Sequence, residues 1–274
     1  MGGIEFLKGH GTQNDFVLLP DPDGRLELTE ARVAALCDRQ RGLGADGVLR
    51  IVRSAALGVE SGGEWFMDYR NADGSIAEMC GNGVRVFVRH LVDSGLVSER
   101  EFVIGTRAGD RPVRMHADGS VTVQMGPATI TGTSVTVVAG QPFSGVAVNV
   151  GNPHLVSVVE DDVDVLDLRD QPDFDSDVFP DGVNLEFINL LGGNELKMRV
   201  HERGVGETRS CGTGTVAAVA AALHLAGTDT GEATVDIPGG RVVVDVRRGG
   251  STLTGPAKIV ARGELDETWW AGLV

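Results

Sequence analysis

Two copies of a Cys-Gly-x-Gly tetrapeptide, beginning at Cys80 and Cys211, are the residues of this chain best suited to chemistry. Each precedes a run with the apolar spacing and the residue types of a helix, so each thiol is expected at a helix start. The positive end of a helix favours ionisation of a thiol there, and its unpaired N–H groups bind carboxylates. Two thiols so placed predict proton transfer on both faces of one carbon, with one sulfur starting as thiolate and the other as thiol.

Other roles for the two thiols fit the sequence less well. A zinc site would need further ligands at spacings such as C-x₂-C or H-x₃-H, which are absent, so no metal is expected. Buried structural cysteines would not need equivalent places before glycines. A single nucleophilic cysteine would need a histidine, for which His154 is the candidate, but that chemistry does not explain two equivalent thiols. The three lysines lie in no recognisable pyridoxal context, so no cofactor is expected.

The thiols occupy matching places in a long internal repeat. Helices are predicted over Val84–Ser94 and Thr215–Ala226, and Gly95 and Gly227 follow them as C-terminal glycines do. The chain after each helix breaks into alternating apolar and polar segments separated by glycine turns, which is typical of strands. These strands are expected over Glu101–Thr106, Val113–His116 and Ser120–Gln124 in the first half, and over Ala233–Ile237, Arg241–Val246 and Ser251–Thr254 in the second.

The sequence before each thiol supplies further elements. A polar loop is predicted over Gly9–Asp15 and a helix from Leu28 to about Arg39. Gly42-Leu-Gly-Ala-Asp-Gly47 matches G-x-G-x-x-G, but the order helix, loop, strand excludes a dinucleotide site and indicates a structural turn. Strands are predicted over Ile4–Lys8, Phe16–Leu19, Val48–Val52, Glu64–Arg70, a segment ending at Gly151, Asn184–Leu190 and Glu195–His201, with an acidic loop over Glu160–Pro180.

The repeat predicts two similar domains of mixed α/β (α+β) class related by a pseudo-two-fold axis. We expect the first over residues 1–125, completed by 261–274, and the second over 126–260. A chain of 274 residues with 42% hydrophobic content is long enough for two cores. A net charge of −15 argues against nucleic acid. Three cysteines make no disulfide framework, and neither a signal peptide nor a membrane span is recognisable, so a cytoplasmic protein is expected.

The segment from Asn71 to Arg85 resembles the N-x-D-G-S-x₄-C-G-N-G-x-R signature of the diaminopimelate epimerases. The resemblance covers the whole chain, including Asn14-Asp-Phe, Gly151-Asn-Pro-His154, Val183-Asn184 and the run from His201 to Gly214. It implies a cofactor-independent enzyme that interconverts LL- and meso-2,6-diaminoheptanedioate, a step of lysine and peptidoglycan biosynthesis. It further implies a homodimer, and domains each built as a β-barrel-like sheet around a central helix, with the active site in the cleft between them.

The resemblance also assigns roles to residues. Cys80 and Cys211 would be the two acid–base groups, and His154 would lie near the thiols and tune them. Glu202 would take the reacting ammonium group, and Arg203 suits a bidentate grip on the distal carboxylate. The remaining candidates are backbone N–H groups for the reacting carboxylate, at Gly81, Asn82, Gly212 and Thr213, and amides for the distal end of the substrate, at Asn14, Asn71, Asn152 and Asn184.

Two features depart from or lie outside this pattern. The family often carries Gln, a substrate contact, where this chain has Gly47, so that contact must be lost or replaced. Cys37 matches no motif and is interpreted as a packed thiol. Two alternatives stay open: a proline or hydroxyproline epimerase, which would not need Arg203, and a non-catalytic small-molecule-binding protein that uses Cys80 and Cys211 as a redox switch. A relative of the phenazine-pathway isomerases is disfavoured by the cysteine pair.

Overall fold

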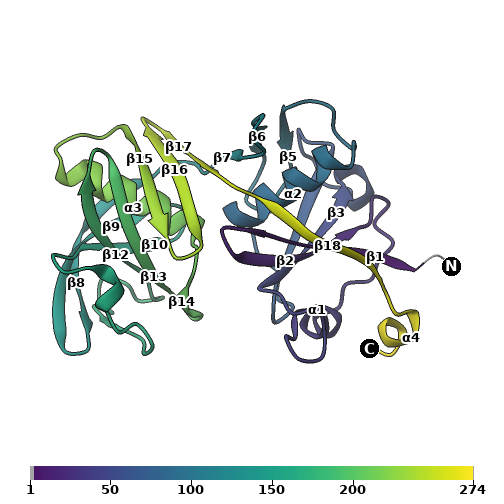
Figure 1. The fold of residues 1–274 in the computed structure, drawn as a ribbon, viewed down its shortest axis with the longest axis horizontal. Helices are drawn as coiled ribbons and strands as arrows, with labels where there is room; N and C mark the ends of the chain where they lie inside the picture. The colour runs from purple at the N-terminus through teal and green to yellow at the C-terminus, as the bar shows by residue number, and fades with distance from the viewer. Residues whose placement is uncertain (1–2, 274) are drawn as a thin grey trace. The chain divides into compact units, whose positions relative to one another are not determined.

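The computed structural model describes residues 3–273 and divides into two compact units, which we describe one at a time. Unit 1 comprises Met1–Val123 with Pro256–Val274, and unit 2 comprises Gln124–Gly255. The chain thus returns to unit 1 at Pro256. Both units are mostly sheet with one long helix each (Figure 1). The prediction of a mixed α/β (α+β) class is confirmed.

The strands of unit 1 surround its long helix. One sheet has the order β18 (Lys258–Leu265), β1 (Ile4–Gly11), β2 (Asn14–Pro20), β3 (Gly47–Arg53) and β4 (Trp65–Asn71). A bridge from Phe66 of β4 to Gly105 continues it toward β5 (Glu101–Ile104), β6 (Arg111–Met115) and β7 (Val121–Gln124). Helix α2 (Gly81–Asp93) packs against β1, β2, β3, β4, β6 and β18. In Figure 1 the yellow β18 runs beside the purple β1, antiparallel to it.

Unit 2 repeats this plan with a helix that is apolar on every side. Helix α3 (Gly212–Leu225) is buried throughout its alanine-rich middle, Val216–Ala221, as an enclosed helix must be. It packs against eight strands of the described chain. The sheet order is β11 (Asp173–Phe174), β8 (Thr129–Val138), β9 (Gln141–Asn149), β10 (Pro153–Val158), β12 (Asn184–Gly192), β13 (Glu195–Glu202), β15 (Gly231–Ile237), β16 (Gly240–Arg247) and β17 (Gly250–Gly255), with β14 (Gly206–Thr208) on β13.

The helix ends agree with the sequence. Both long helices are followed by glycines in the left-handed region, Gly95 at φ 72° and Gly227 at φ 76°. The shorter α1 (Glu30–Cys37) is capped by Thr29, whose hydroxyl accepts the Arg32 N–H at 3.2 Å. The segment Gly42–Gly47 connects α1 to β3, and a Cβ at Gly42 would lie 1.9 Å from the Ala35 carbonyl oxygen. The prediction that this run is a structural turn is confirmed.

Several elements differ from expectation. The predicted polar loop over Gly9–Asp15 is a tight hairpin, because β1 runs to Gly11 and β2 begins at Asn14. Strands β8, β10 and β18 and the short helix α4 (Glu267–Ala271) were not expected. Strands β8 and β18 expose most of their side chains, so they lack the apolar alternation that identifies a strand. In the described part of the chain, no helix is long and apolar enough to cross a membrane.

Candidate functional site

Cys80 and Cys211 are the N-cap residues of α2 and α3, with nearly the same backbone geometry. The Cys80 sulfur accepts the Gly83 N–H at 3.5 Å, and the Cys211 sulfur accepts the Gly214 N–H at 3.4 Å. The first two helical residues, whose N–H groups are the candidates for binding a carboxylate, are Gly81 and Asn82 in α2 and Gly212 and Thr213 in α3. The prediction of two thiols at helix starts is confirmed.

In unit 1, Asn14 connects the first strand pair to the thiol. Its Oδ1 accepts from the Cys80 sulfur at 3.5 Å and from Asn82 Nδ2 at 3.2 Å. Its Nδ2 donates to Asp46 Oδ2 at 2.7 Å. The amide is therefore held in one orientation, and the structure brings together three of the residues predicted from sequence, Asn14, Cys80 and Asn82.

The turn that carries Asn14 adopts a conformation that its residues disfavour. Thr12 and Gln13 join β1 to β2 with φ of 49° and 64°. Two-residue hairpin turns of this kind normally use Asn-Gly or Gly, and a β-branched residue at positive φ is a genuine outlier. Thr12 is buried, and its hydroxyl accepts from Arg85 Nη2 at 2.9 Å. Strain of this kind persists only where the surroundings impose it, and Arg85 is the side chain positioned to do so.

Arg85 is a buried cation one turn into α2. Its side chain is fully buried, and its Nε donates to the Pro256 carbonyl oxygen at 3.3 Å. Within residues 3–273, Nη1 has no hydrogen-bond partner. Burial lowers the pKa of the guanidinium to about 10, and a negative charge on Cys80 opposes that shift. Because this attraction is mutual, Arg85 favours a thiolate at Cys80.

Asn71 lies at the end of β4 and is held by its own loop. Its Nδ2 donates to Ser75 Oγ at 3.0 Å, and its backbone N–H donates to the Ser75 carbonyl at 2.9 Å. The neighbouring strand carries Gly47 opposite Asn71. A Cβ at Gly47 would lie 2.5 Å from the Arg70 carbonyl oxygen and 2.7 Å from the Tyr69 ring. The space for a side chain at position 47 is therefore filled by β4, which accounts for glycine there.

In unit 2, strand register gathers the polar residues on one face. His154 of β10 pairs with Asn184 of parallel β12, and Glu186 of β12 pairs with Val200 of antiparallel β13. Since residues two apart share a face, His154, Asn184, Glu186 and Glu202 point to the same side of the sheet. A Cβ at Gly214 would lie 2.5 Å from Glu186 Oε1, so this is the side occupied by the first turn of α3.

His154 is fully buried, and both of its ring nitrogens have partners. Nδ1 lies 2.7 Å from Glu186 Oε1, and Nε2 lies 2.9 Å from Asn152 Oδ1. With a carbonyl oxygen as partner, Nε2 carries a proton. The structure thereby brings Asn152 and His154 together, and adds Glu186, which the sequence analysis did not identify.

Glu202 lies beside the second thiol. Burial raises the pKa of its carboxyl group, and the charge of Glu186 adds to the rise. Hydrogen bonds from the Thr208 hydroxyl and the Cys211 thiol oppose the shift. Cys211 itself is buried, and its sulfur lies 3.6 Å from Thr213 Oγ1.

The expected ease of ionisation does not hold for Cys211. Burial raises the pKa of this thiol well above its usual value, and the charges of Glu202 and Glu186 raise it further. The Gly214 N–H and Thr213 oppose the rise without cancelling it. The helix-start argument considered only the local N–H groups, whereas two carboxylates from β12 and β13 act on the same sulfur.

Arg203 and Asn184 are connected through the backbone. Asn184 Oδ1 accepts the Arg203 N–H at 3.0 Å, and Asn184 Nδ2 donates to the Pro153 carbonyl oxygen at 3.2 Å. The exposed guanidinium of Arg203 donates to the Asp181 carbonyl oxygen at 2.9 Å. The Asn184 amide thus positions the backbone that carries both Glu202 and Arg203.

We call the residues around each thiol its half-site, one around Cys80 in unit 1 and one around Cys211 in unit 2. The sequence analysis did not identify two of the residues that contribute to them, Glu186 and the buried Arg85. The available signal was the same for both: a single charged residue inside an apolar run, in Asn184–Leu190 and in Val84–Val88. Charged residues are almost never fully buried unless they are paired, so a charged residue in such a run indicates a partner inside the protein.

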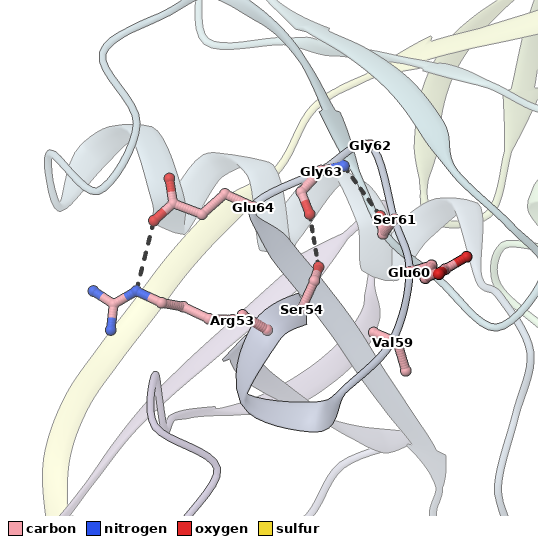
Figure 2. A pocket seen from close by; sticks show the side chains of 9 residues that line it. Arg53, Ser54, Val59, Glu60, Ser61, Gly62, Gly63 and Glu64 are labelled. Carbon is pink, nitrogen blue, oxygen red and sulfur yellow. Dashed lines mark hydrogen bonds and ion pairs between the residues drawn. The ribbon is translucent and has the colours of Figure 1, made fainter.

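Other features carry no comparable chemistry. Cys37 is packed in the core of unit 1 with Val33 and Leu36, and burial raises its pKa to about 12, so its interpretation as a packed thiol is confirmed. A hollow of about 420 Å³ is lined by Arg53, Ser54, Ala55 and Val59 and by the loop from Glu60 to Glu64. Figure 2 shows the side chains that line it. Its polar groups bind one another, as Ser54 Oγ does the Gly63 carbonyl at 2.7 Å. No cluster of three metal-ligating side chains occurs over residues 3–273.

Comparison with known proteins agrees with this arrangement. The sequence profile of the diaminopimelate epimerases matches residues 6–131 and 146–260. A diaminopimelate epimerase of Rhodococcus opacus is 54% identical over 288 aligned positions, covering 98% of this chain and 100% of that protein.

Two solved structures share the fold at low identity. One is a hydroxyproline epimerase from Agrobacterium vitis (TM-score 0.66, 15% identity, covering 99% of this chain and 95% of that one). The other is a phenazine biosynthesis protein of the PhzF family from Bacillus anthracis (TM-score 0.66, 18% identity, covering 97% and 100%). They establish the architecture. The profile match over residues 6–131 and 146–260 and the match to the Rhodococcus protein over 98% of this chain establish the family. The chain belongs to the diaminopimelate epimerase family.

Proposed function

We propose that the protein interconverts LL- and meso-2,6-diaminoheptanedioate without a cofactor, by proton transfer between one α-carbon and two cysteine sulfurs. The observation that carries the proposal is the equivalence of Cys80 and Cys211 as N-caps of the long helices of the two units. Inversion needs two such groups, one for each face of the carbon. In the cell the reaction would serve lysine and peptidoglycan biosynthesis, and we propose a cytoplasmic homodimer.

In this reaction one thiolate removes the α-proton from one face while the other thiol delivers a proton to the opposite face. The reverse reaction exchanges their roles. The carbanion that develops is stabilised through its carboxylate by the N–H groups at both helix starts, Gly81 and Asn82 in one and Gly212 and Thr213 in the other. Both sulfurs must reach the same carbon at about hydrogen-bond distance.

The other residues hold the substrate. Glu202 takes the reacting ammonium group, and Arg203 binds the distal carboxylate. Asn14, Asn71 and Asn152 bind the distal amino-acid end through amides that both donate and accept. Asn184 binds that end as well, and its amide also holds the backbone that carries Arg203. His154 supports the Cys211 side.

Isotope exchange tests the proposal directly. LL-diaminoheptanedioate incubated in D₂O with the protein should give the meso isomer with deuterium at one α-carbon, read by NMR and chiral chromatography. Product without deuterium, or no conversion, would overturn the two-base mechanism.

A substrate panel separates this function from its nearest competitor. Because the chain shares its fold with a hydroxyproline epimerase, proline and trans-4-hydroxyproline are the comparison substrates. We expect turnover of diaminoheptanedioate alone, because a ring substrate has no distal carboxylate for Arg203. Arg203→Met should raise KM for diaminoheptanedioate; turnover of proline by the unmodified protein would favour the competing assignment.

A further inference from the structure

Glu186 is a fully buried carboxylate that has no role in the reaction proposed above. It lies on β12, among the buried apolar residues Leu185, Phe187 and Ile188, in a strand that packs against α3. Placing a carboxylate in a protein interior costs several kcal/mol unless charge and hydrogen bonds compensate. Its Oε1 lies 2.7 Å from His154 Nδ1, and both side chains have no exposed surface. Among residues 3–273, its Oε2 has no hydrogen-bond partner, so the compensation is incomplete.

The second observation is the close approach of this carboxylate to the first turn of α3. A Cβ at Gly214 would meet Glu186 Oε1 at 2.5 Å and the Cys211 sulfur at 3.3 Å. Gly214 therefore lies between the carboxylate and the thiol, and only glycine leaves room for both. The same Gly214 donates its N–H to the Cys211 sulfur. The carboxylate, the helix start and the thiol form one packed group.

We infer that Glu186 is a positioning residue of the Cys211 half-site, which fixes the His154 ring and holds negative charge against the first turn of α3. The inference rests on the proposed function for its catalytic meaning, but its electrostatic part concerns the protein without substrate. Because Nε2 of His154 faces the side-chain amide oxygen of Asn152 and Nδ1 faces Glu186, both ring nitrogens are engaged in hydrogen bonds. The ring can then neither turn nor exchange tautomers freely.

The consequence for Cys211 is that it stays a thiol in the free protein. The charged or titratable groups that face it are His154 from β10, Glu186 from β12 and Glu202 from β13. His201 lies on the opposite face of β13. The other strands packed on α3 bury apolar or hydroxyl side chains. These are Thr136 and Val138 of β8, Phe143 and Ala147 of β9, Ala233 and Val235 of β15, Val242 and Val244 of β16, and Ser251 and Leu253 of β17. Two carboxylates and one imidazole therefore decide the charge of this half-site.

The test is residue-resolved alkylation of the full-length protein by iodoacetamide as a function of pH, read by peptide mass spectrometry. Glu186→Gln keeps the shape of the side chain and removes its charge. We expect alkylation of Cys211 near pH 8 to rise about tenfold or more in Glu186→Gln, since removing one nearby like charge lowers a pKa by roughly a unit or more. Cys80 in the same sample is the internal control and should react at an unchanged rate.

Two outcomes would overturn the inference. A folded Glu186→Gln protein, judged by circular dichroism and thermal unfolding, whose Cys211 reacts at the unmodified rate would remove the electrostatic role. Equal acceleration at Cys80 and Cys211 would indicate general loosening. If the unmodified protein showed no epimerase activity, the proposed function would be wrong. The alkylation rate of Cys211 would still test the electrostatic role of Glu186.

A measurement on the unmodified protein covers the case in which Glu186→Gln fails to fold. Nitrogen NMR of ¹⁵N-labelled histidine should show the Nε2 proton of His154 hydrogen-bonded and protected from exchange with solvent. A His154 ring whose Nε2 proton exchanges freely with solvent, or whose Nδ1 shows no hydrogen bond, would contradict the buried pair.

Discussion

In both half-sites a cysteine caps a helix, but the side chains around the two sulfurs carry opposite charges. Cys80 and Cys211 cap their helices through the third N–H, at 3.5 and 3.4 Å. Around Cys80 stand an amide, Asn14, and a buried guanidinium, Arg85. Around Cys211 stand two carboxylates, Glu202 and Glu186. The helix start provides the donors in both places, while strands from elsewhere in each unit set the charge.

This difference suits a pair of groups that must start in opposite protonation states. The Cys80 thiol donates to Asn14 in this structure, and the buried cation would stabilise a thiolate there once that proton is lost. The buried carboxylates preserve the thiol at Cys211. Two identical surroundings would leave either state of the pair equally populated. The asymmetry therefore belongs to the resting enzyme, before any substrate adds its own charges.

The largest expected effect comes from removing one thiol at a time. Cys80→Ala and Cys211→Ala should each lower kcat/KM for epimerisation by about 10³-fold or more, because each removes an acid–base group that contributes ~10² to 10⁴. Each variant should still exchange the α-proton of one stereoisomer, and a different one in each case, measured as deuterium uptake without inversion.

Cys37→Ala is the matched control, since this thiol is packed away from both helix starts. It should retain full turnover. Near-normal epimerisation by either Cys80→Ala or Cys211→Ala would break the comparison, because one group would then serve both faces.

Removing the buried cation of unit 1 should come next in size. Arg85→Met should slow alkylation of Cys80 about tenfold near pH 8 and lower kcat/KM by roughly 10- to 100-fold, because the thiolate loses its compensating charge. Arg85→Lys, which keeps the charge and loses the fork, should recover part of the alkylation rate. Cys211 should be unaffected in both.

Arg89→Met is the control on the same helix, because Arg89 forms a partly exposed pair with Asp93. It should leave Cys80 reactivity unchanged. If Arg89→Met slowed Cys80 as much as Arg85→Met, the effect would belong to α2 as a whole.

A smaller effect concerns the third thiol, which belongs to neither half-site. Burial raises the pKa of Cys37 to about 12 from an ordinary value of 9.0. The unfolded chain therefore ionises first, and the stability that Cys37 contributes is present below pH 9 and is lost as pH rises toward 12. The free energy of unfolding should fall by up to about 1.4 kcal/mol per pH unit from this group.

Urea titrations at pH 8.5, 9.5 and 10.5 would measure the slope. Cys37→Ala should flatten it, although the smaller side chain lowers stability at every pH. Cys211 adds a parallel contribution, because its pKa is also raised. An unchanged slope in Cys37→Ala would show that this thiol does not titrate in the window.

The smallest expected effect compares the two turns that lead into the half-sites. Gln13 has a φ of 64° in unit 1, whereas Gly151 has a φ of 89° in unit 2. Gln13→Gly should stabilise the protein by up to about 1 kcal/mol, because relief of strain exceeds the entropy cost of glycine. Gly151→Ala should destabilise it by about 1 kcal/mol or more. Thermal unfolding measures the change in stability of each variant. Destabilisation by Gln13→Gly would mean that the turn in unit 1 is not strained.

The local part of each half-site could be predicted from the sequence. Cys80 and Cys211 precede glycines and a helical run, and capping follows from residues within four positions of each other. The glycines at 95 and 227 ended the helices for the same local reason. Strands with clear alternation, such as those ending at Gln124 and Ile237, were likewise found within a few residues of their true ends.

Charge at the thiols could not be predicted in this way. Glu186 is buried because β12 lies between β10 and β13. Arg85 contacts Thr12 because β1 and β2 form a hairpin, where the sequence predicts a polar loop. Both are contacts between residues far apart in the chain. Strands β8 and β18 escaped prediction because their exposed faces erase the alternation on which the prediction relies.

The return of the chain at Pro256 has a consequence for the order in which the protein is made. Unit 2 is one continuous segment, Gln124–Gly255, whereas unit 1 needs its last strand, β18, to pair with β1 from the start of the chain. Domains fold as units during synthesis. While the residues after Gly255 are still held by the ribosome, the strands of the second unit have been made, and the edge of β1 that pairs with β18 is still open. Premature termination in the final residues should expose that edge to aggregation, and chaperone demand should concentrate there.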